Sequence, residues 1–312
     1  MLMSMSRFAV AAVLFVCATG SPVPAAAPRD TLLVSTTWLA QHLKDANLVL
    51  LHIGDEAEYK AAHIPGALFL DVTKQLARHD DDKNLNLEML PVDVLHDRLA
   101  ALGISDNSRI IVYYAKDRIT ISTRAMFTLD YAGLGAKASL LDGGMGAWTR
   151  DGQKVTDAET PAPKAGTLAP LKIQPEVVDA AFVRAHLKTP GFAVVDARAG
   201  TYYDGTQNGA TAGGPEKFGH LPGAMNVPFT ETTDDKMMWK SADELAALFS
   251  KAGVKSGETV IAYCHLGQQA TATIFAARSL GFTVLLYDGS FQDWAARDFP
   301  VEKSPGRGAG PR

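Results

Sequence analysis

The sequence predicts an α/β protein built from two domains, each a mostly parallel sheet flanked by helices. The chain has 312 residues, more than one domain usually holds, so two domains are expected. Short apolar runs alternate with helical patterns, which is typical of parallel strands covered on both faces. The same succession occurs twice, in residues 30–150 and 176–304, and this repeat indicates two copies of one fold.

Each half contains the same motifs in the same order, and both halves end on an Asp-Gly turn with a tryptophan behind it. Along the chain, the pairs are apolar strands at 48–51 and 192–195, His-Ile/Leu-Pro-Gly-Ala at 63–67 and 220–224, amphipathic helices at 92–102 and 242–252, apolar strands at 110–113 and 260–263, and the endings Asp142-Gly143…Trp148 and Asp288-Gly289…Trp294. We expect the two tryptophans to pack in the cores.

The remaining segments are assigned by composition. Residues 151–175 are rich in Pro, Ala, Gly, Lys and Thr without periodicity and are predicted to be a linker. Residues 1–27 combine Arg7, a short apolar stretch and three alanines, which is the pattern of a cleaved signal peptide. The tail, residues 305–312, is predicted to be disordered. The signal peptide predicts a periplasmic or secreted protein.

Composition limits the partners. With 47% apolar and 21% charged residues the chain is an ordinary globular protein. Its net charge of −4 gives no general attraction to nucleic acid or to an anionic membrane. We therefore expect no nucleic-acid partner, and no membrane contact after signal cleavage.

The sequence has two cysteines, Cys17 and Cys264, and the first would leave with the signal peptide. A mature chain with one cysteine cannot form an internal disulfide, although an oxidising compartment would favour one. Such a cysteine is either buried and inert or a reactive thiol. The eight histidines show no close metal-ligand spacing, and one cysteine cannot build a thiolate zinc site, so no metal or cofactor is expected.

Cys264 stands between an apolar run, residues 260–263, and a helical pattern from Gln269 to Leu280. Free backbone N–H groups and the positive end of the helix dipole converge at such a point and stabilise an anion such as a thiolate. We expect a nest of N–H groups around Sγ, with Gly267 supplying a positive φ and with a lowered thiol pKa that leaves mostly thiolate at neutral pH. The expected active-site loop consists of His265, Leu266, Gly267, Gln268, Gln269 and Ala270.

Only the second half carries this thiol. Alignment of the halves places Tyr114 where Cys264 stands, and the loop after Tyr114, residues 115–118, has no glycine equivalent to Gly267. The first half is therefore predicted to keep the fold without the chemistry.

This set of motifs resembles the tandem-domain rhodanese family, the thiosulfate and 3-mercaptopyruvate sulfurtransferases. The resemblance covers nearly the whole mature chain and includes Met89-Leu90-Pro91 ahead of a helix. It implies that Cys264 takes a sulfane sulfur from a small donor, holds it as a persulfide, and passes it to a thiophilic acceptor such as cyanide or a thiol.

The residues after Cys264 depart from both donor types of that family. Thiosulfate-type members tend to have basic residues there and mercaptopyruvate-type members Gly-Ser-Gly, whereas this chain has His265, Leu266 and Gly267. Of the two donors, we expect thiosulfate rather than 3-mercaptopyruvate.

Further site residues follow from the resemblance. Asp196-Ala197-Arg198 matches the family's Asp-x-Arg, which implies that Arg198 binds an anionic donor. An internal pair with Asp196 is the alternative, and both are compatible because a guanidinium has spare donors. Tyr202 lies nearest the place of a further family arginine. His265 could donate a proton, contact substrate or be an exposed loop residue, and His63 could reach the cleft between the domains.

Three other functions are to be weighed. A cysteine-dependent phosphatase needs an arginine that follows the cysteine after five residues, and Ala270 stands there. A persulfide carrier that delivers sulfur to a protein partner would use the same Cys264 persulfide. A purely structural tandem domain would leave Cys264 unreactive.

Overall fold

The computed structural model describes residues 28–80, 85–209 and 214–304. The expected signal peptide and C-terminal tail lie outside these residues. No helix in the described ranges is both long and apolar enough to cross a membrane.

The first domain holds, in chain order, α1 (Pro28–Leu32), β1 (Leu33–Val34), α2 (Thr36–His42), β2 (Leu48–Ile53), α3 (Glu56–Ala61), β3 (Leu68–Phe69), α4 (Val72–Gln75), β4 (Ala77–Asp80), β5 (Leu85–Met89), α5 (Val92–Ala101), β6 (Arg109–Tyr114), α6 (Ile119–Tyr131), the 3-10 turn η1 (Gly135–Lys137), β7 (Ala138–Leu141) and α7 (Gly144–Arg150). After an extended linker, the second holds β8 (Val177–Val178), α8 (Ala180–His186), β9 (Phe192–Asp196), α9 (Gly200–Tyr203), β10 (Met225–Asn226), η2 (Phe229–Glu231), α10 (Ala242–Ala252), β11 (Thr259–Tyr263), α11 (Gln268–Ser279), β12 (Val284–Tyr287) and α12 (Ser290–Ala296).

The two domains have the same sheet. Among the described residues, one five-stranded sheet has the order β1-β7-β6-β2-β3 and the other β8-β12-β11-β9-β10, and every strand pair in them is parallel. In corresponding registers, His52 pairs with Tyr113 and Asp196 with Tyr263. The predicted α/β class with two equivalent, mostly parallel sheets is confirmed.

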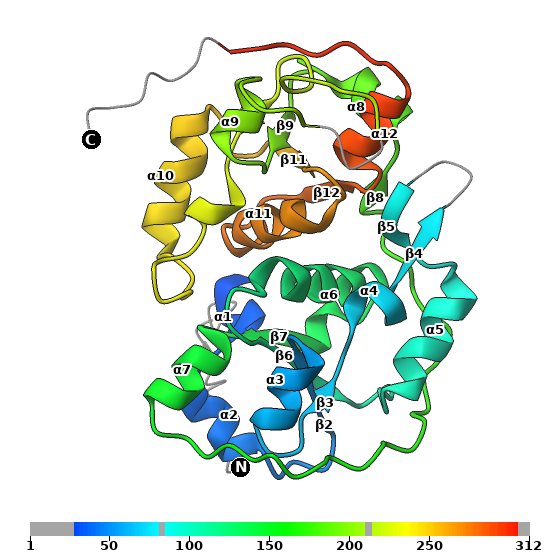
Figure 1. Cartoon of the computed structure of the whole chain (residues 1–312), viewed down its shortest axis with the longest axis vertical. Coiled ribbons are helices and arrows are strands. Elements are labelled where there is room, and N and C mark those ends of the chain that lie inside the picture. The colour runs from blue at the N-terminus through cyan, green and yellow to red at the C-terminus, as the bar shows by residue number, and fades with distance from the viewer. Residues whose placement is uncertain (1–27, 81–84, 210–213, 305–312) are drawn as a thin grey trace, which may run out of the picture.

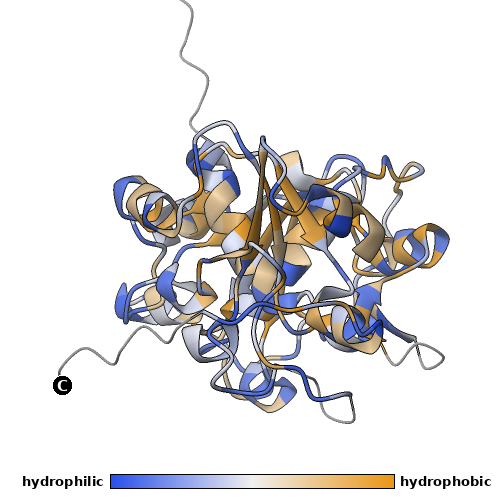
Figure 2. Ribbon diagram, turned by 90° about the horizontal axis from the view of Figure 1, so that it is seen from above, coloured by the Kyte–Doolittle hydropathy of each residue, from blue (hydrophilic) through white to orange (hydrophobic). Residues whose placement is uncertain are grey.

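The long strands form because their apolar runs are buried from both sides. Residues 49–53 of β2 and 260–263 of β11 are buried throughout, as expected for parallel strands between two layers of helices. Figure 2 shows hydrophobic strands in the middle of the molecule, with helices of mixed hydropathy around them. Trp148 and Trp294 are also buried, in the cores of their domains.

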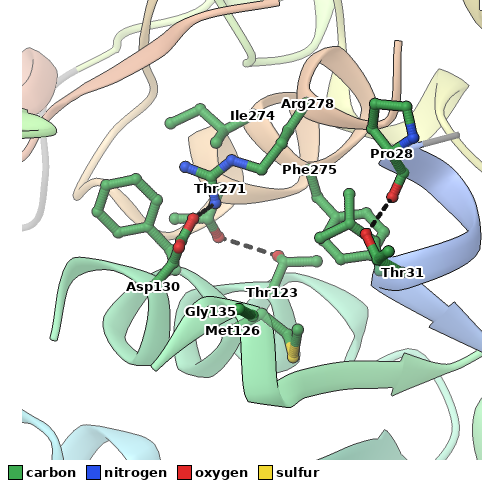
Figure 3. Close-up of a pocket in the computed structure, with 13 residues that line it drawn as sticks. Pro28, Thr31, Thr123, Met126, Asp130, Gly135, Thr271, Ile274, Phe275 and Arg278 are labelled. Carbon is green, nitrogen blue, oxygen red and sulfur yellow. Dashed lines mark hydrogen bonds and ion pairs between the residues drawn. The ribbon is translucent and has the colours of Figure 1, made fainter. Parts of the chain in front are cut away.

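The domains share a buried interface in which α6 packs against α11 (Figure 1). One hydrophobic cluster contains core residues of both domains, including Phe127 of α6 and Phe275 of α11. A small cavity of about 160 Å³ lies along this seam beside α1, where Thr123 and Thr271 share a hydrogen bond of 2.9 Å (Figure 3).

A two-stranded antiparallel hairpin, β4–β5, extends from the first domain alongside the second (Figure 1). Its backbone bonds to α12 of the second domain, because the Asn86 N–H donates to Gln292 Oε1 at 3.0 Å and Gln292 Nε2 donates to the Asn86 carbonyl at 2.9 Å. The first domain thus reaches the end of the second sheet where β11 and β12 stop.

Candidate active site

Cys264 immediately follows β11, and the loop after it runs into α11. The side chain is almost wholly buried, with 1% exposed. Four backbone N–H groups around the sulfur lower the pKa of the thiol, those of Ala270, Leu266, Gln269 and Gly267. The loop therefore forms a nest of N–H groups around Sγ at a helix N-terminus.

The resting thiol differs from the expectation. Burial raises the pKa of the Cys264 thiol, and this effect outweighs the four N–H groups, which lower it. The prediction of a mostly ionised thiol at neutral pH was wrong, because it counted the N–H groups and omitted the desolvation of a fully enclosed sulfur. The nest can still stabilise negative charge on sulfur when it forms during a reaction.

Gly267 permits the curl of this loop. Its φ is +78°, in the region that favours glycine. A Cβ there would lie 2.8 Å from the Asp288 carbonyl oxygen and 3.1 Å from Arg124 Nη1, so the residue also fills a tight space.

The turn between β12 and α12 is hydrogen-bonded to the backbone of Cys264. The Cys264 N–H donates to Ser290 Oγ at 3.2 Å, and the Phe291 N–H donates to the Cys264 carbonyl at 3.0 Å. Ser290 has a φ of +50°, which is uncommon for a residue with a Cβ. The expected Asp-Gly turn is therefore part of the site's framework.

Arg198 and Asp196 form a fully buried pair. Arg198 Nε lies 2.9 Å from Asp196 Oδ1 and Nη2 lies 2.6 Å from Oδ2, while Nη2 also donates to the Gly219 carbonyl at 2.7 Å. Nη1 is buried and has no hydrogen-bond partner among the described residues. A Cβ on Gly209 would lie 2.3 Å from Nη1, so the backbone of Gly209 approaches it closely.

His265 and Tyr202 lie on the same side of the loop. Their rings meet edge to face with centroids 4.6 Å apart. His265 Nδ1 lies 3.0 Å from the Gly209 carbonyl, which can only accept, so Nδ1 carries the proton. Burial and the nearby Arg198 lower the pKa of His265, which favours the neutral ring. Of the three roles considered, this half-buried ring is not a freely exposed loop residue.

The two glutamines of the loop have different surroundings. Gln268 Nε2 donates to Thr120 Oγ1 of the first domain at 2.9 Å, and Gln268 lines an interdomain cavity of about 650 Å³. Gln269 Oε1 is buried without a hydrogen-bond partner in the described residues. Ala270, the next residue of the loop, is fully buried.

His63 is placed elsewhere, among residues of the first domain and the linker. Its ring stacks on Tyr59, its Nδ1 bonds to the Tyr59 carbonyl at 2.7 Å, and its backbone pairs with Thr156. His220 makes the equivalent contacts with Tyr203 and Glu302 in the second domain. The structure therefore groups Cys264, Arg198, Tyr202 and His265, and gives His63 the surroundings of a turn histidine.

In the first domain the equivalent positions are filled differently. His52 occupies the register position of Asp196 and bonds through Nδ1 to the Tyr113 hydroxyl at 2.8 Å, as Asp196 bonds to Tyr263. Tyr114 is the last residue of β6, whereas Cys264 comes directly after β11, and the Tyr114 hydroxyl donates to the Met237 carbonyl across the interface at 2.5 Å.

Sequence reasoning missed the first-domain residues that contact the loop. Arg124 of α6 is fully buried and bonds Asp288 at 2.6 Å, while the Met89 N–H donates to the other Asp288 oxygen at 2.8 Å. A signal was present, because Arg124 is a charged residue within the otherwise uncharged run 119–129 of a buried helix.

Both halves of the chain match one known protein family. Residues 35–151 and 179–297 each match the family described as "Rhodanese-like domain". The 3-mercaptopyruvate sulfurtransferase of Rattus norvegicus is 31% identical over 299 residues, covering 88% of this chain and 96% of that protein. The thiosulfate sulfurtransferase of the same organism is 30% identical over 293 residues, covering 86% and 93%.

Solved structures agree. The crystal structure of SseA from Escherichia coli, described as a 3-mercaptopyruvate sulfurtransferase of "Rhodanese" fold, superposes with a TM-score of 0.71 at 27% identity and covers 84% of this chain and 99% of that one. The fold and the matched domains define a tandem rhodanese protein, and the chain belongs to the rhodanese family. Within that family it is a sulfurtransferase.

Proposed function

We propose that this sulfurtransferase takes a sulfane sulfur from 3-mercaptopyruvate, holds it as a persulfide on Cys264, and passes it to a thiol or cyanide. The observation that carries the proposal is the enclosure of Cys264 Sγ by four backbone N–H groups. Such a nest accommodates an anionic sulfur, whether the thiolate or the persulfide, without supplying a proton to quench it.

The proposed reaction consists of two sulfur-transfer steps at Cys264. The Cys264 thiolate attacks the donor sulfur, a sulfur–sulfur bond forms, and the carbon–sulfur bond of 3-mercaptopyruvate breaks. The bonding electrons leave on the pyruvate enolate, which takes a proton to become pyruvate. The acceptor thiolate or cyanide then attacks the outer sulfur and releases the Cys264 thiolate.

The surroundings of Arg198 favour a donor with one negative charge. Arg198 Nη1 is a buried donor without a partner among the described residues, while its other nitrogens are committed to Asp196 and Gly219. One N–H group without a described partner suits a single carboxylate, and the lowered pKa of His265 disfavours a second cation beside it. The dianion thiosulfate would bring a second charge, so we propose 3-mercaptopyruvate in place of thiosulfate, which we expected from the sequence. The rat and E. coli relatives that are named 3-mercaptopyruvate sulfurtransferase also support this donor.

The decisive experiment is mass spectrometry of the protein after separate exposure to 3-mercaptopyruvate and to thiosulfate. We expect Cys264 to gain the mass of one sulfur atom with 3-mercaptopyruvate at a higher rate than with thiosulfate. Cys264→Ser is the matched control, because serine fits the loop and cannot hold a sulfane sulfur. Sulfur transfer by that variant would exclude the mechanism, and faster loading from thiosulfate would exclude the donor.

A persulfide carrier is distinguished from an enzyme by turnover. An enzyme with small-molecule acceptors produces many equivalents of thiocyanate from the donor and cyanide without a protein partner. A carrier loads once and waits. We expect saturable turnover with kcat well above the rate of uncatalysed exchange.

We also propose that the chain works outside the cytoplasm. The support is the pattern of its first 27 residues, with Arg7, a short apolar stretch and a run of alanines. Cell fractionation of the full-length protein with a C-terminal tag tests this: the tag should be found outside the cytoplasm on a shortened chain. A full-length cytoplasmic product would refute it.

A further inference from the structure

Arg124 of the non-catalytic domain lies directly against the catalytic loop. Its side chain is fully buried on α6, at the seam between the domains. Nη1 donates to Asp288 Oδ1 at 2.6 Å and lies 3.5 Å from the Gly267 carbonyl, and Nη2 donates to the Leu87 carbonyl at 2.5 Å. One guanidinium therefore joins α6, the hairpin and two segments of the second domain.

The first of these segments carries the support of Cys264. Asp288 follows β12 and stands two residues before Ser290, whose Oγ accepts the Cys264 N–H. Arg124 fixes one carboxylate oxygen of Asp288, and the Met89 N–H fixes the other at 2.8 Å. The turn is thus held at both carboxylate oxygens by the first domain.

The second segment is the nest itself. Gly267 lies between Arg124 Nη1 and the Asp288 carbonyl, where a Cβ would be 3.1 Å and 2.8 Å from them. The N–H groups of Gly267 and Leu266 are two of the four that lower the pKa of the Cys264 thiol. A shift of the loop toward a vacated Arg124 site would turn these N–H groups away from Sγ.

The charges around Arg124 favour a role in positioning the loop over a role in stability alone. A buried ion pair often contributes little net stability, because the desolvation of two charges offsets their attraction. Here the site holds a second carboxyl, Glu88 of β5, whose pKa is raised to about 7 by burial and by Asp288. Arg124 is the buried cation beside both carboxyls, and Arg78 also faces Glu88, as does the carboxyl of Asp293.

The corresponding turn of the first domain provides a comparison. Asp142 also accepts an N–H across the interface, from Trp239 at 2.9 Å. Among the described residues, however, a fully buried arginine bonds to the turn aspartate only on the side that carries the thiol. The buried arginine therefore occurs at the turn that lies beside Cys264, and not at the corresponding turn of the first domain.

We infer that Arg124 is a positioning residue for sulfur transfer: the silent domain supplies it to hold Gly267 and Asp288 so that the N–H nest converges on Cys264. This inference rests on the proposed function and names the part that the first domain plays in it. It explains why the catalytic half is joined to a half without a nucleophile.

The test compares Arg124→Met with Arg124→Lys and a control, Arg278→Met. Arg278 is also an α11–α6 interface cation, paired with Asp130 and Glu176 at the other end of α11 (Figure 3). Steady-state turnover should fall about 100-fold in Arg124→Met with KM within about twofold, as for a misplaced reacting group. Arg124→Lys should recover part of the loss, and Arg278→Met should keep wild-type turnover.

A second readout does not depend on the sulfur donor. The pH midpoint for alkylation of Cys264 by iodoacetamide should move upward in Arg124→Met and stay unchanged in Arg278→Met. Wild-type turnover and an unmoved midpoint in Arg124→Met would overturn the inference, as would equal losses in Arg124→Met and Arg278→Met. If the wild type forms no persulfide from either donor, the proposed function fails while the alkylation midpoint still decides the role of Arg124.

Arg124→Met leaves Asp288 without its cation, which can prevent folding. The double variant Arg124→Met/Asp288→Asn removes this charge and keeps an oxygen to accept the Met89 N–H. We expect the double variant to fold, by circular dichroism, and to show the same loss of turnover and the same shift of the midpoint. Wild-type values for both in the folded double variant would overturn the inference.

Discussion

Gly267 combines a backbone conformation and a close contact that no other residue type satisfies together. Gly267→Ala places a Cβ at a φ of +78° and 2.8 Å from the Asp288 carbonyl. The left-handed conformation alone costs about 1–2 kcal/mol, and the contact forces the loop to move. We expect sulfur transfer to be lost, measured as thiocyanate formation.

Gly66→Ala is the matched control. Its φ is +82°, but a Cβ there meets nothing within 4 Å. This variant should lose about 1–2 kcal/mol of stability from the conformation alone and keep full turnover. Wild-type activity in Gly267→Ala would show that the loop does not need its present shape.

The pH dependence of Cys264 reactivity follows from its burial. Because enclosure raises the pKa of the thiol, the thiolate fraction at a given pH is smaller than that of a free cysteine, whose pKa is about 8.5. The rate of alkylation by iodoacetamide should therefore rise with pH and reach half its maximum above that value, with N-acetylcysteine as the reference. A midpoint below 8 would mean that the N–H groups outweigh burial.

At this scale the sequence located the thiol and the glycine, because a strand, a cysteine and a helix start are local patterns. It could not give the state of the thiol, which depends on how completely distant segments enclose it. It also could not pair Arg124 with Asp288, which are 164 residues apart and in different domains. Only a buried charge in a buried helix pointed to Arg124.

Among the elements, the β4–β5 hairpin links the first domain to α12. Gln292→Ala removes two hydrogen bonds to the hairpin backbone, each contributing about 1 kcal/mol. We expect a loss of about 2 kcal/mol in the free energy of unfolding by urea. Asn86→Ala is the control, because the bonds use its backbone and should survive. Equal losses in the two variants would contradict the assignment.

The helices and strands that the sequence predicted are those with a strong local pattern. The helix expected at 242–252 is α10, which a capping box of Ser241 and Glu244 begins. The hairpin was not predicted. Its second strand does alternate buried and half-buried residues, with Leu85, Leu87 and Met89 buried, but five residues give a weak signal.

The whole molecule should unfold as one unit. A common hydrophobic cluster crosses the interface between the domains. Buried hydrogen bonds also join α6 to α11 and to Asp288, in the turn between β12 and α12. Neither domain can unfold without exposing apolar surface of the other, which couples their transitions. Calorimetry should show a single peak, and Arg278→Met should lower its temperature without splitting it. Two separate peaks would show that the domains are independent.

The presence of a single cysteine among the described residues bears on the kinetic mechanism of the proposed reaction. The part of the chain that the structure describes contains one cysteine, so no neighbouring thiol there can resolve a persulfide into an internal disulfide. In the proposed reaction donor and acceptor both react at the Cys264 sulfur, so we expect two half-reactions that are separate in time. Double-reciprocal plots at several acceptor concentrations should therefore be parallel lines, and the loaded enzyme should survive gel filtration away from its donor.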